Sequence, residues 1–186
     1  FVDNIRIFAR AGKGGNGLVS FRRAKFVPKG GPDGGDGGDG GSVILEVDPH
    51  TNDLRSFFYD PKLIATDGVG GQSAKKHGKN GKSVIGKVPP GTIIYRSNAS
   101  SMAEATWLER EGEGIELEKI ADLTEIGTRF TLCQGGLGGK GNWHFRSATN
   151  QAPTEAEMGT EGEEGVFFME LRRIADAGLE IGRAHV

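Results

Sequence analysis

Apolar and polar residues alternate in short runs along most of the chain. Such runs, rich in β-branched and aromatic side chains, are typical of half-buried β-strands. They occupy residues 2–9, 18–21, 42–48, 54–59, 62–66, 84–88, 92–96, 120–123, 128–133 and 166–175. Turn signals such as Pro89-Pro90-Gly91 separate neighbouring runs. Many short strands separated by turns predict a mainly β fold, an antiparallel barrel or sandwich.

Residues 97–118 depart from this pattern. Helix-forming residues follow a capping candidate, Ser101, and continue through Arg110. The segment also carries six glutamates. We interpret it as an acidic insertion with one short helix, placed on a hairpin between two strands.

Glycine recurs at every third position in several separate stretches. The longest is residues 30–41, GGPDGGDGGDGG, and the same spacing occurs at Gly12/Gly15, Gly14/Gly17, Gly78/Gly81, Gly135/Gly138/Gly141 and Gly159/Gly162/Gly165. Neither an α-helix nor a β-strand has this period, whereas polyproline II has three residues per turn and no internal hydrogen bonds. The spacing predicts a bundle of polyproline II segments that bond to one another. Unrelated glycine-rich linkers, the alternative, have no reason to keep a period.

Composition excludes a disordered low-complexity chain. Glycine accounts for 32 of 186 residues, yet 35% of the residues are hydrophobic and flank the glycine runs. The single cysteine, Cys133, lies in an apolar strand pattern and is expected to be buried. One cysteine excludes an internal disulfide and a cysteine-rich zinc site. With no signal peptide and no apolar run of membrane-spanning length, we expect a cytoplasmic protein.

Two glycine motifs suggest nucleotide sites but lack the required context. Residues 12–17 match GxGxxG, but LVSF and then Pro28 follow instead of a helix. Gly81-Lys82-Ser83 resembles the end of a phosphate loop, but Lys76 stands where that motif needs its first glycine. A strand pattern then follows instead of a helix. We therefore predict no nucleotide site in these residues.

The residues also show no catalytic or metal-binding constellation. The four histidines have no metal-ligand spacing among themselves. Asp33, Asp36 and Asp39 are spaced by three, whereas an EF-hand loop uses a spacing of two and a distal glutamate. We interpret these aspartates as solvated or hydrogen-bonding groups, and expect neither an enzyme activity nor a metal in this chain.

The distribution of charge is more informative than the net charge of −2. Cations gather in three long glycine-rich connections, the basic loops 22–41, 68–82 and 135–152, whereas glutamates gather at 104–118 and 155–164. The loop cations are Arg22, Arg23, Lys25, Lys29, Lys75, Lys76, Lys79, Lys82, Lys140 and Arg146. If the loops share one end of the molecule, that end attracts a polyphosphate, and aromatic residues between the cations suit stacking on unpaired bases. Alternatively, the lysines only keep glycine-rich loops soluble.

Residues 11–41, AGKGGNGLVSFRRAKFVPKGGPDGGDGGDGG, strongly resemble the N-terminal domain of the Obg family of GTPases. VPPGT (88–92), ADLTEIG (121–127), GGLGGKGN (135–142) and NQAP (150–153) match the same family in order. The resemblance covers residues 1–179. It implies an antiparallel β-barrel that carries a projecting bundle of polyproline II helices.

The resemblance also implies a function. Obg-type GTPases act in the assembly of the large ribosomal subunit, where the glycine-rich tip enters the peptidyl-transferase region. The ten loop cations would then contact rRNA. GTP and Mg²⁺ would bind a separate GTPase domain, which should follow residue 179 and is absent here.

Two segments depart from the family pattern. The insertion 97–118 is longer than the usual turn at that place. Residues 180–186, EIGRAHV, replace the expected continuation into a phosphate loop, and we interpret them as a non-native tail. The alternative function is a protein-interaction module that regulates the attached GTPase in stress or cell-cycle signalling, with assembly or stress-response proteins as partners.

Overall fold

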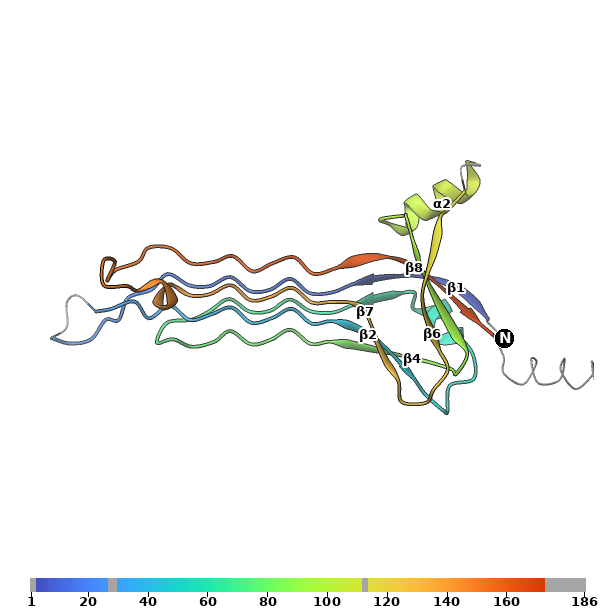
Figure 1. Cartoon of the computed structure of the whole chain (residues 1–186), viewed down its shortest axis with the longest axis horizontal. Helices are drawn as coiled ribbons and strands as arrows, with labels where there is room; N and C mark the ends of the chain where they lie inside the picture. Colours follow the sequence, from blue (N-terminus) through green and yellow to red (C-terminus); the bar gives the residue numbers. More distant parts are fainter. Residues whose placement is uncertain (1–2, 27–29, 112–113, 173–186) are drawn as a thin grey trace, which may run out of the picture.

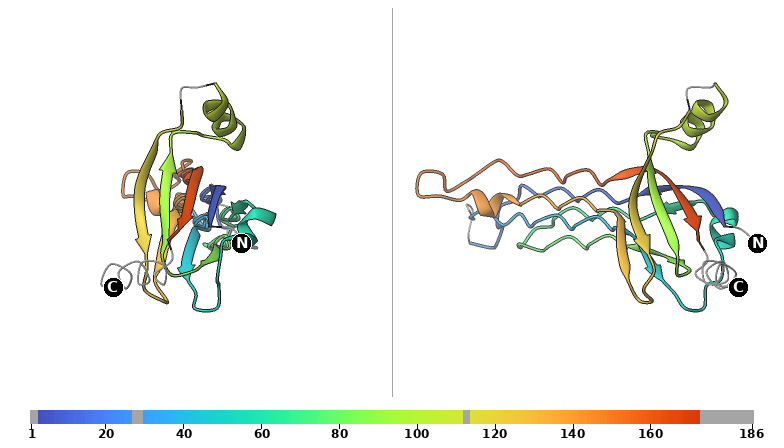
Figure 2. Two further views of the ribbon diagram at one scale, coloured as in Figure 1. Left: turned by 90° about the vertical axis from the view of Figure 1, so that its right-hand side faces the viewer. Right: turned by 45° about the vertical axis from the view of Figure 1, so that its right-hand side comes forward.

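The computed structural model describes residues 3–26, 30–111 and 114–172. It is elongated (Figure 1): strands form a body at one end, and six extended segments lead away from it side by side. Two further views show the same arrangement (Figure 2). The predicted tail 180–186 and the end of the domain after residue 172 lie outside the described residues.

Eight strands and two α-helices form the described part of the body, and a 3₁₀ helix lies in the third basic loop. The strands are β1 Asn4–Arg10, β2 Val43–Val47, β3 Lys62–Ile64, β4 Val84–Val88, β5 Thr92–Ser97, β6 Leu117–Leu123, β7 Arg129–Cys133 and β8 Glu164–Leu171. The helices are α1 Arg55–Tyr59, α2 Met102–Arg110 and the 3₁₀ helix η1 Asn142–Phe145. One sheet has the order β3-β1-β8-β5-β6 and the other β4-β2-β7. The mainly β prediction is confirmed.

The sheets are mixed and not purely antiparallel as the sequence suggested. β1 pairs with β3 in parallel, and β2 pairs with β4 in parallel. The cause is the direction of the chain: β1, β3 and β7 lead into the extended segments, whereas β2, β4 and β8 return from them (Figure 1). Strands that run the same way pair in parallel, and β1–β8 and β2–β7, which run oppositely, pair antiparallel.

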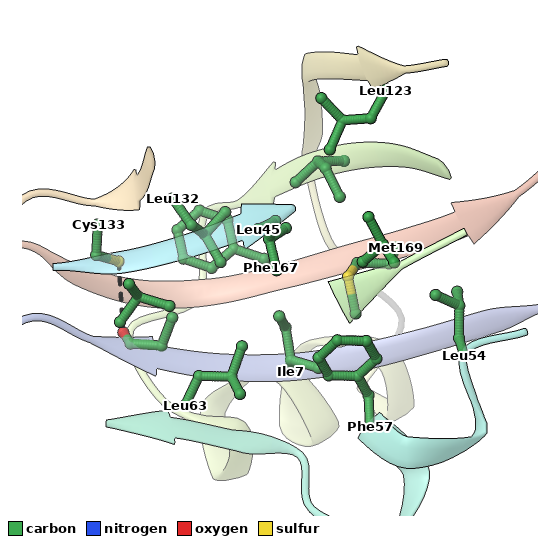
Figure 3. Packing of buried hydrophobic residues seen from close by; sticks show 14 of the residues in the cluster. Ile7, Leu45, Leu54, Phe57, Leu63, Leu123, Leu132, Cys133, Phe167 and Met169 are labelled. Atoms are coloured by element: carbon green, nitrogen blue, oxygen red, sulfur yellow. Dashed lines mark hydrogen bonds between the residues drawn. The ribbon is translucent and has the colours of Figure 1, made fainter. Parts of the chain in front are cut away.

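The core lies between the two sheets (Figure 3). Along β2, buried and half-buried residues alternate, so that Leu45 and Val47 face inward. Phe167 and Met169 of β8 and Ile7 of β1 complete the same fully or nearly fully buried cluster. This cluster fixes the strands from which the extended segments start.

Two predicted strands are wrong. Residues 55–59 form α1, because only Phe57 needs to be buried there and one helical turn places it beside Ile7 (Figure 3). Residues 18–21 form no strand; they continue an extended segment and make only an isolated bridge between Phe21 and Pro32.

The insertion 97–118 contains the predicted helix between the paired strands β5 and β6. The Ser101 hydroxyl accepts a hydrogen bond from the Glu104 N–H at 3.0 Å, which caps α2. Ala105 and Leu108 are buried in a second cluster with Phe8 and Val166. The helix, drawn above β1 and β8 in Figure 1, therefore contacts the body through these side chains.

Candidate nucleic-acid interface

Six extended segments bond to one another at every third residue. They comprise residues 11–18, 34–41, 66–72, 76–82, 135–141 and 157–163. In one pair, the N–H groups of Gly12, Gly15 and Leu18 donate to the carbonyls of Gly41, Gly38 and Gly35 at 2.8, 2.8 and 3.1 Å. This period, in segments that form neither helix nor strand, is what the polyproline II hypothesis requires.

The segments 11–18 and 34–41 form the centre of the bundle. Each forms backbone hydrogen bonds with the other and with three of the four surrounding segments. A Cβ atom on Gly37 would overlap the Gly15 carbonyl oxygen, and one on Gly138 would overlap the Gly37 carbonyl oxygen. Glycine at these positions lets the backbones approach closely enough to bond.

The bundle carries all three basic loops to the end opposite the sheets (Figures 1 and 2). We call this end the tip, and define it as the described residues of 19–33, 72–76 and 142–156. The turn 72–76 and η1 lie at about the same distance from the sheets (Figure 1). The described residues of 19–33 and the chain that follows η1 extend further from the sheets. The described parts of the three basic loops thus lie at the same end of the molecule, which was the condition set in the sequence analysis.

The aspartates of the central segment bond to backbone N–H groups. Asp36 accepts a hydrogen bond from the Gly141 N–H at 2.8 Å, and Asp39 accepts one from Gly138 at 2.8 Å. Partial burial alone would raise the pKa of Asp36, but the hydrogen bonds from Gly141 and His144 and the charges of His144 and His77 outweigh it and lower the pKa. These carboxylates hold the bundle together.

The predicted loop cations are exposed, apart from Lys29, which lies outside the described residues. Within residues 3–26, 30–111 and 114–172, none of the other nine forms an ion pair. In contrast, seven cations nearer the body pair with carboxylates: Arg6, Arg10, Lys13, Arg55, Lys119, Arg129 and Arg172. Four further cations of the described body form no ion pair: Lys62, Lys87, Arg96 and Arg110. The described lysines and arginines of the tip therefore form no ion pair with a described carboxylate, although Asp33 and Glu155 also belong to the tip.

The cations do not all lie at the tip. Lys75 and Lys76 belong to its turn, whereas Lys79 and Lys82 follow on the segment that returns to β4. The Lys82 N–H donates to the Thr66 hydroxyl at 2.7 Å, close to the body. At about 3.1 Å per residue, Lys82 stands roughly 20 Å from Lys75. The interface thus includes one flank of the bundle.

The sequence analysis did not identify Asn142 as a functional or structural residue, although it is the last residue of GGLGGKGN (135–142). Its side chain is fully buried, and its Oδ1 accepts a hydrogen bond from the Gly34 N–H at 2.8 Å. Its Nδ2 donates to the carbonyls of Ser20 and Pro153 at 3.0 Å each. One amide therefore joins three parts of the chain where the tip begins. The only signal in the sequence is an asparagine directly after a period-three run.

In the part of the chain that the structure describes, no three or more His, Cys, Asp or Glu residues are grouped to hold a metal ion. No helix among the described residues is long and apolar enough to cross a membrane.

The GTP1/OBG family profile matches residues 2–173 of the chain. The GTPase Obg of Methylacidiphilum infernorum is 48% identical over 181 residues, which are 96% of this chain and 50% of that protein. The GTPase Obg of Chlorobium chlorochromatii is 49% identical over 179 residues, 96% of this chain and 48% of that protein. That of Clostridioides difficile is 46% identical, with 96% and 38% covered. The chain spans half or less of the length of these relatives. It belongs to the GTP1/OBG family.

Proposed function

We propose that this chain is the ribosome-binding domain of an Obg-type GTPase. Its tip binds RNA of the large ribosomal subunit during assembly of that subunit, near the peptidyl-transferase region. The GTPase activity, with GTP and Mg²⁺, belongs to a domain in the part of the relatives' length that this chain does not span. The whole protein acts in the cytoplasm.

One observation carries the proposal: exposed cations that form no ion pair with any described residue are concentrated at the end and along one flank of a backbone-bonded bundle. Loops with many glycines are usually mobile, but here hydrogen bonds at every third residue fix their roots. The nearby aspartates are engaged with backbone N–H groups. Such a narrow, positively charged end suits a site surrounded by phosphates, and phosphate contacts provide most of the affinity for nucleic acids.

The test is binding of the chain to purified large ribosomal subunits at several salt concentrations. The tip variant combines Lys75→Glu and Lys76→Glu. A matched control combines Lys62→Glu and Lys87→Glu, two exposed lysines of β3 and β4 in the body. We expect the tip variant to bind at least tenfold more weakly and its salt dependence to fall by about one unit of slope per lost phosphate contact. The control should bind like the native chain.

If both variants lose the same affinity for ribosomal subunits, the loss reflects the change in net charge and not the position of the lysines, and the proposal is contradicted. The alternative from the sequence, a protein-interaction domain that regulates the attached GTPase, has one supporting observation: Trp107 on α2 is 53% exposed. Partner binding that survives ribonuclease and high salt, and that Trp107→Ala removes, would favour this alternative.

A further inference from the structure

A lysine covers an aromatic ring at the tip. The Lys75 Nζ lies 4.9 Å from the centre of the Trp143 ring. The His144 ring lies 4.2 Å from the same ring, at an interplanar angle of 35°. Trp143 is still 37% exposed. The largest aromatic face of the described tip is thus partly shielded by two groups.

Lys75 reaches this ring from a strained turn. Ala74 and Lys75 both have left-handed backbones, with φ of 60° and 57°. The Lys76 N–H donates to the Ser73 carbonyl at 3.3 Å, which closes the turn. Two consecutive residues of this kind are normally glycine or asparagine. Strain kept without glycine is typical of functional positions.

Asp33 holds the strained turn in place. Its Oδ2 accepts a hydrogen bond from the Ala74 N–H at 3.1 Å, and its carbonyl oxygen accepts one from the Lys75 N–H at 2.7 Å. These two bonds fix the backbone that aims Lys75 at Trp143.

Asp36 holds the other group. The His144 Nε2 lies 2.8 Å from the Asp36 Oδ1 and 2.9 Å from its Oδ2. Asp33 and Asp36 are three residues apart, so the period of the segment places them on the same edge. One edge of the central segment therefore positions both the lysine and the histidine against the indole.

We propose that Trp143 is a stacking site for an unpaired RNA base, and that Lys75 covers this ring in the free protein and moves to the adjacent phosphate when the base arrives. The inference rests on the proposed function. An exposed cation over a ring binds weakly, whereas a base stacked on an aromatic ring contributes more. The exchange is favourable because the displaced ammonium gains a phosphate.

Charge favours a nucleotide over a peptide as the occupant. Lys76, Lys140 and Arg146 are further exposed cations of the basic loops, without ion pairs among the described residues. A stacked base brings a phosphate into this surrounding, whereas an aromatic peptide side chain brings no such charge.

The chain has two tryptophans, so Trp107→Phe leaves Trp143 as the only indole. In this variant we would titrate a single-stranded adenosine hexanucleotide and, separately, inorganic polyphosphate. We expect the hexanucleotide to quench Trp143 fluorescence by stacking, and polyphosphate to bind without such quenching. Equal changes with both probes, or no change with the hexanucleotide, would overturn the proposal.

A second measurement uses affinity. Trp143→Leu should weaken hexanucleotide binding about tenfold and leave polyphosphate binding unchanged, whereas Trp143→Phe, which keeps a ring, should stay within about threefold of the native chain. If Trp143→Leu binds the hexanucleotide as tightly as the native chain, the stacking site is refuted. If Lys75→Glu with Lys76→Glu still weakens binding to ribosomal subunits in that case, the proposed function stands; if that variant also binds normally, both fail.

Discussion

The α-carbon of Gly37 faces the carbonyl oxygen of Gly15 so closely that a Cβ on Gly37 would overlap this oxygen. The Gly37 N–H donates at the same place to the Gly139 carbonyl at 2.9 Å. A glycine here is thus enclosed by two other backbones, and neither can withdraw without losing hydrogen bonds. The bundle exists because these positions have no side chain.

Gly37→Ala should therefore destabilise the bundle by about 1–3 kcal/mol, because the methyl group must push two bonded backbones apart. The matched control is Gly70→Ala, because a Cβ at Gly70 would meet only the Asn16 carbonyl oxygen at 3.6 Å, an ordinary contact. For Gly70→Ala we expect the free energy of unfolding to change by less than about 1 kcal/mol. Urea unfolding followed by circular dichroism measures both, and equal effects would contradict the close-packing argument.

Asn142 provides the second prediction. Asn142→Ala removes three side-chain hydrogen bonds and leaves the Gly34 N–H without this acceptor in a buried place. We expect a loss of about 2–4 kcal/mol in the free energy of unfolding. Asn80 is the control, because its exposed side chain accepts one bond, from the Asp39 N–H at 2.9 Å. Asn80→Ala should cost about 1 kcal/mol; a similar loss in both variants would show that Asn142 has no special role.

The sequence predicted the features that repeat. The glycine period indicated which backbones come together, and alternation located all eight strands within about four residues of their observed bounds. Features that depend on tertiary contacts at one place in the fold could not be predicted. α1 forms because one helical turn buries Phe57, and Asn142 is buried only because three segments of the chain meet around it. The parallel strand pairs follow from chain direction in the bundle, which local patterns do not contain.

Cys133 provides a probe of the body that needs no substitution. Burial and the charge of Glu163 raise the pKa of its thiol to about 12, and the thiol lies 3.7 Å from the Ala9 carbonyl oxygen, to which it donates. The reactive thiolate is therefore almost absent at pH 8. We expect iodoacetamide to alkylate Cys133 only as fast as the body unfolds, with a rate that rises along the urea transition. Rapid alkylation in native buffer would show that this part of the core opens independently.

The last prediction concerns acid. Hydrogen bonds from Gly141 and His144 lower the pKa of Asp36 in the folded chain. A carboxyl group with a lowered folded pKa stabilises the fold above its unfolded pKa of about 3.9, and this contribution is lost as the pH falls through the folded value. Asp36→Asn should thus be less stable than the native chain at pH 5 and above, and the difference in the free energy of unfolding should shrink as the pH falls below about 4 and through the lower folded pKa.

Unfolding in urea between pH 6 and pH 2.5 measures this difference. Asp60→Asn is the matched control, because Asp60 is exposed and makes no described side-chain hydrogen bond. The free energy of unfolding of this control should stay close to that of the native chain from pH 6 to pH 2.5. Other carboxylates also titrate in this range, but they are common to the native chain and the variant and cancel in the comparison. A difference for Asp36→Asn that persists unchanged to pH 2.5 would mean that the charge of Asp36 does not stabilise the fold.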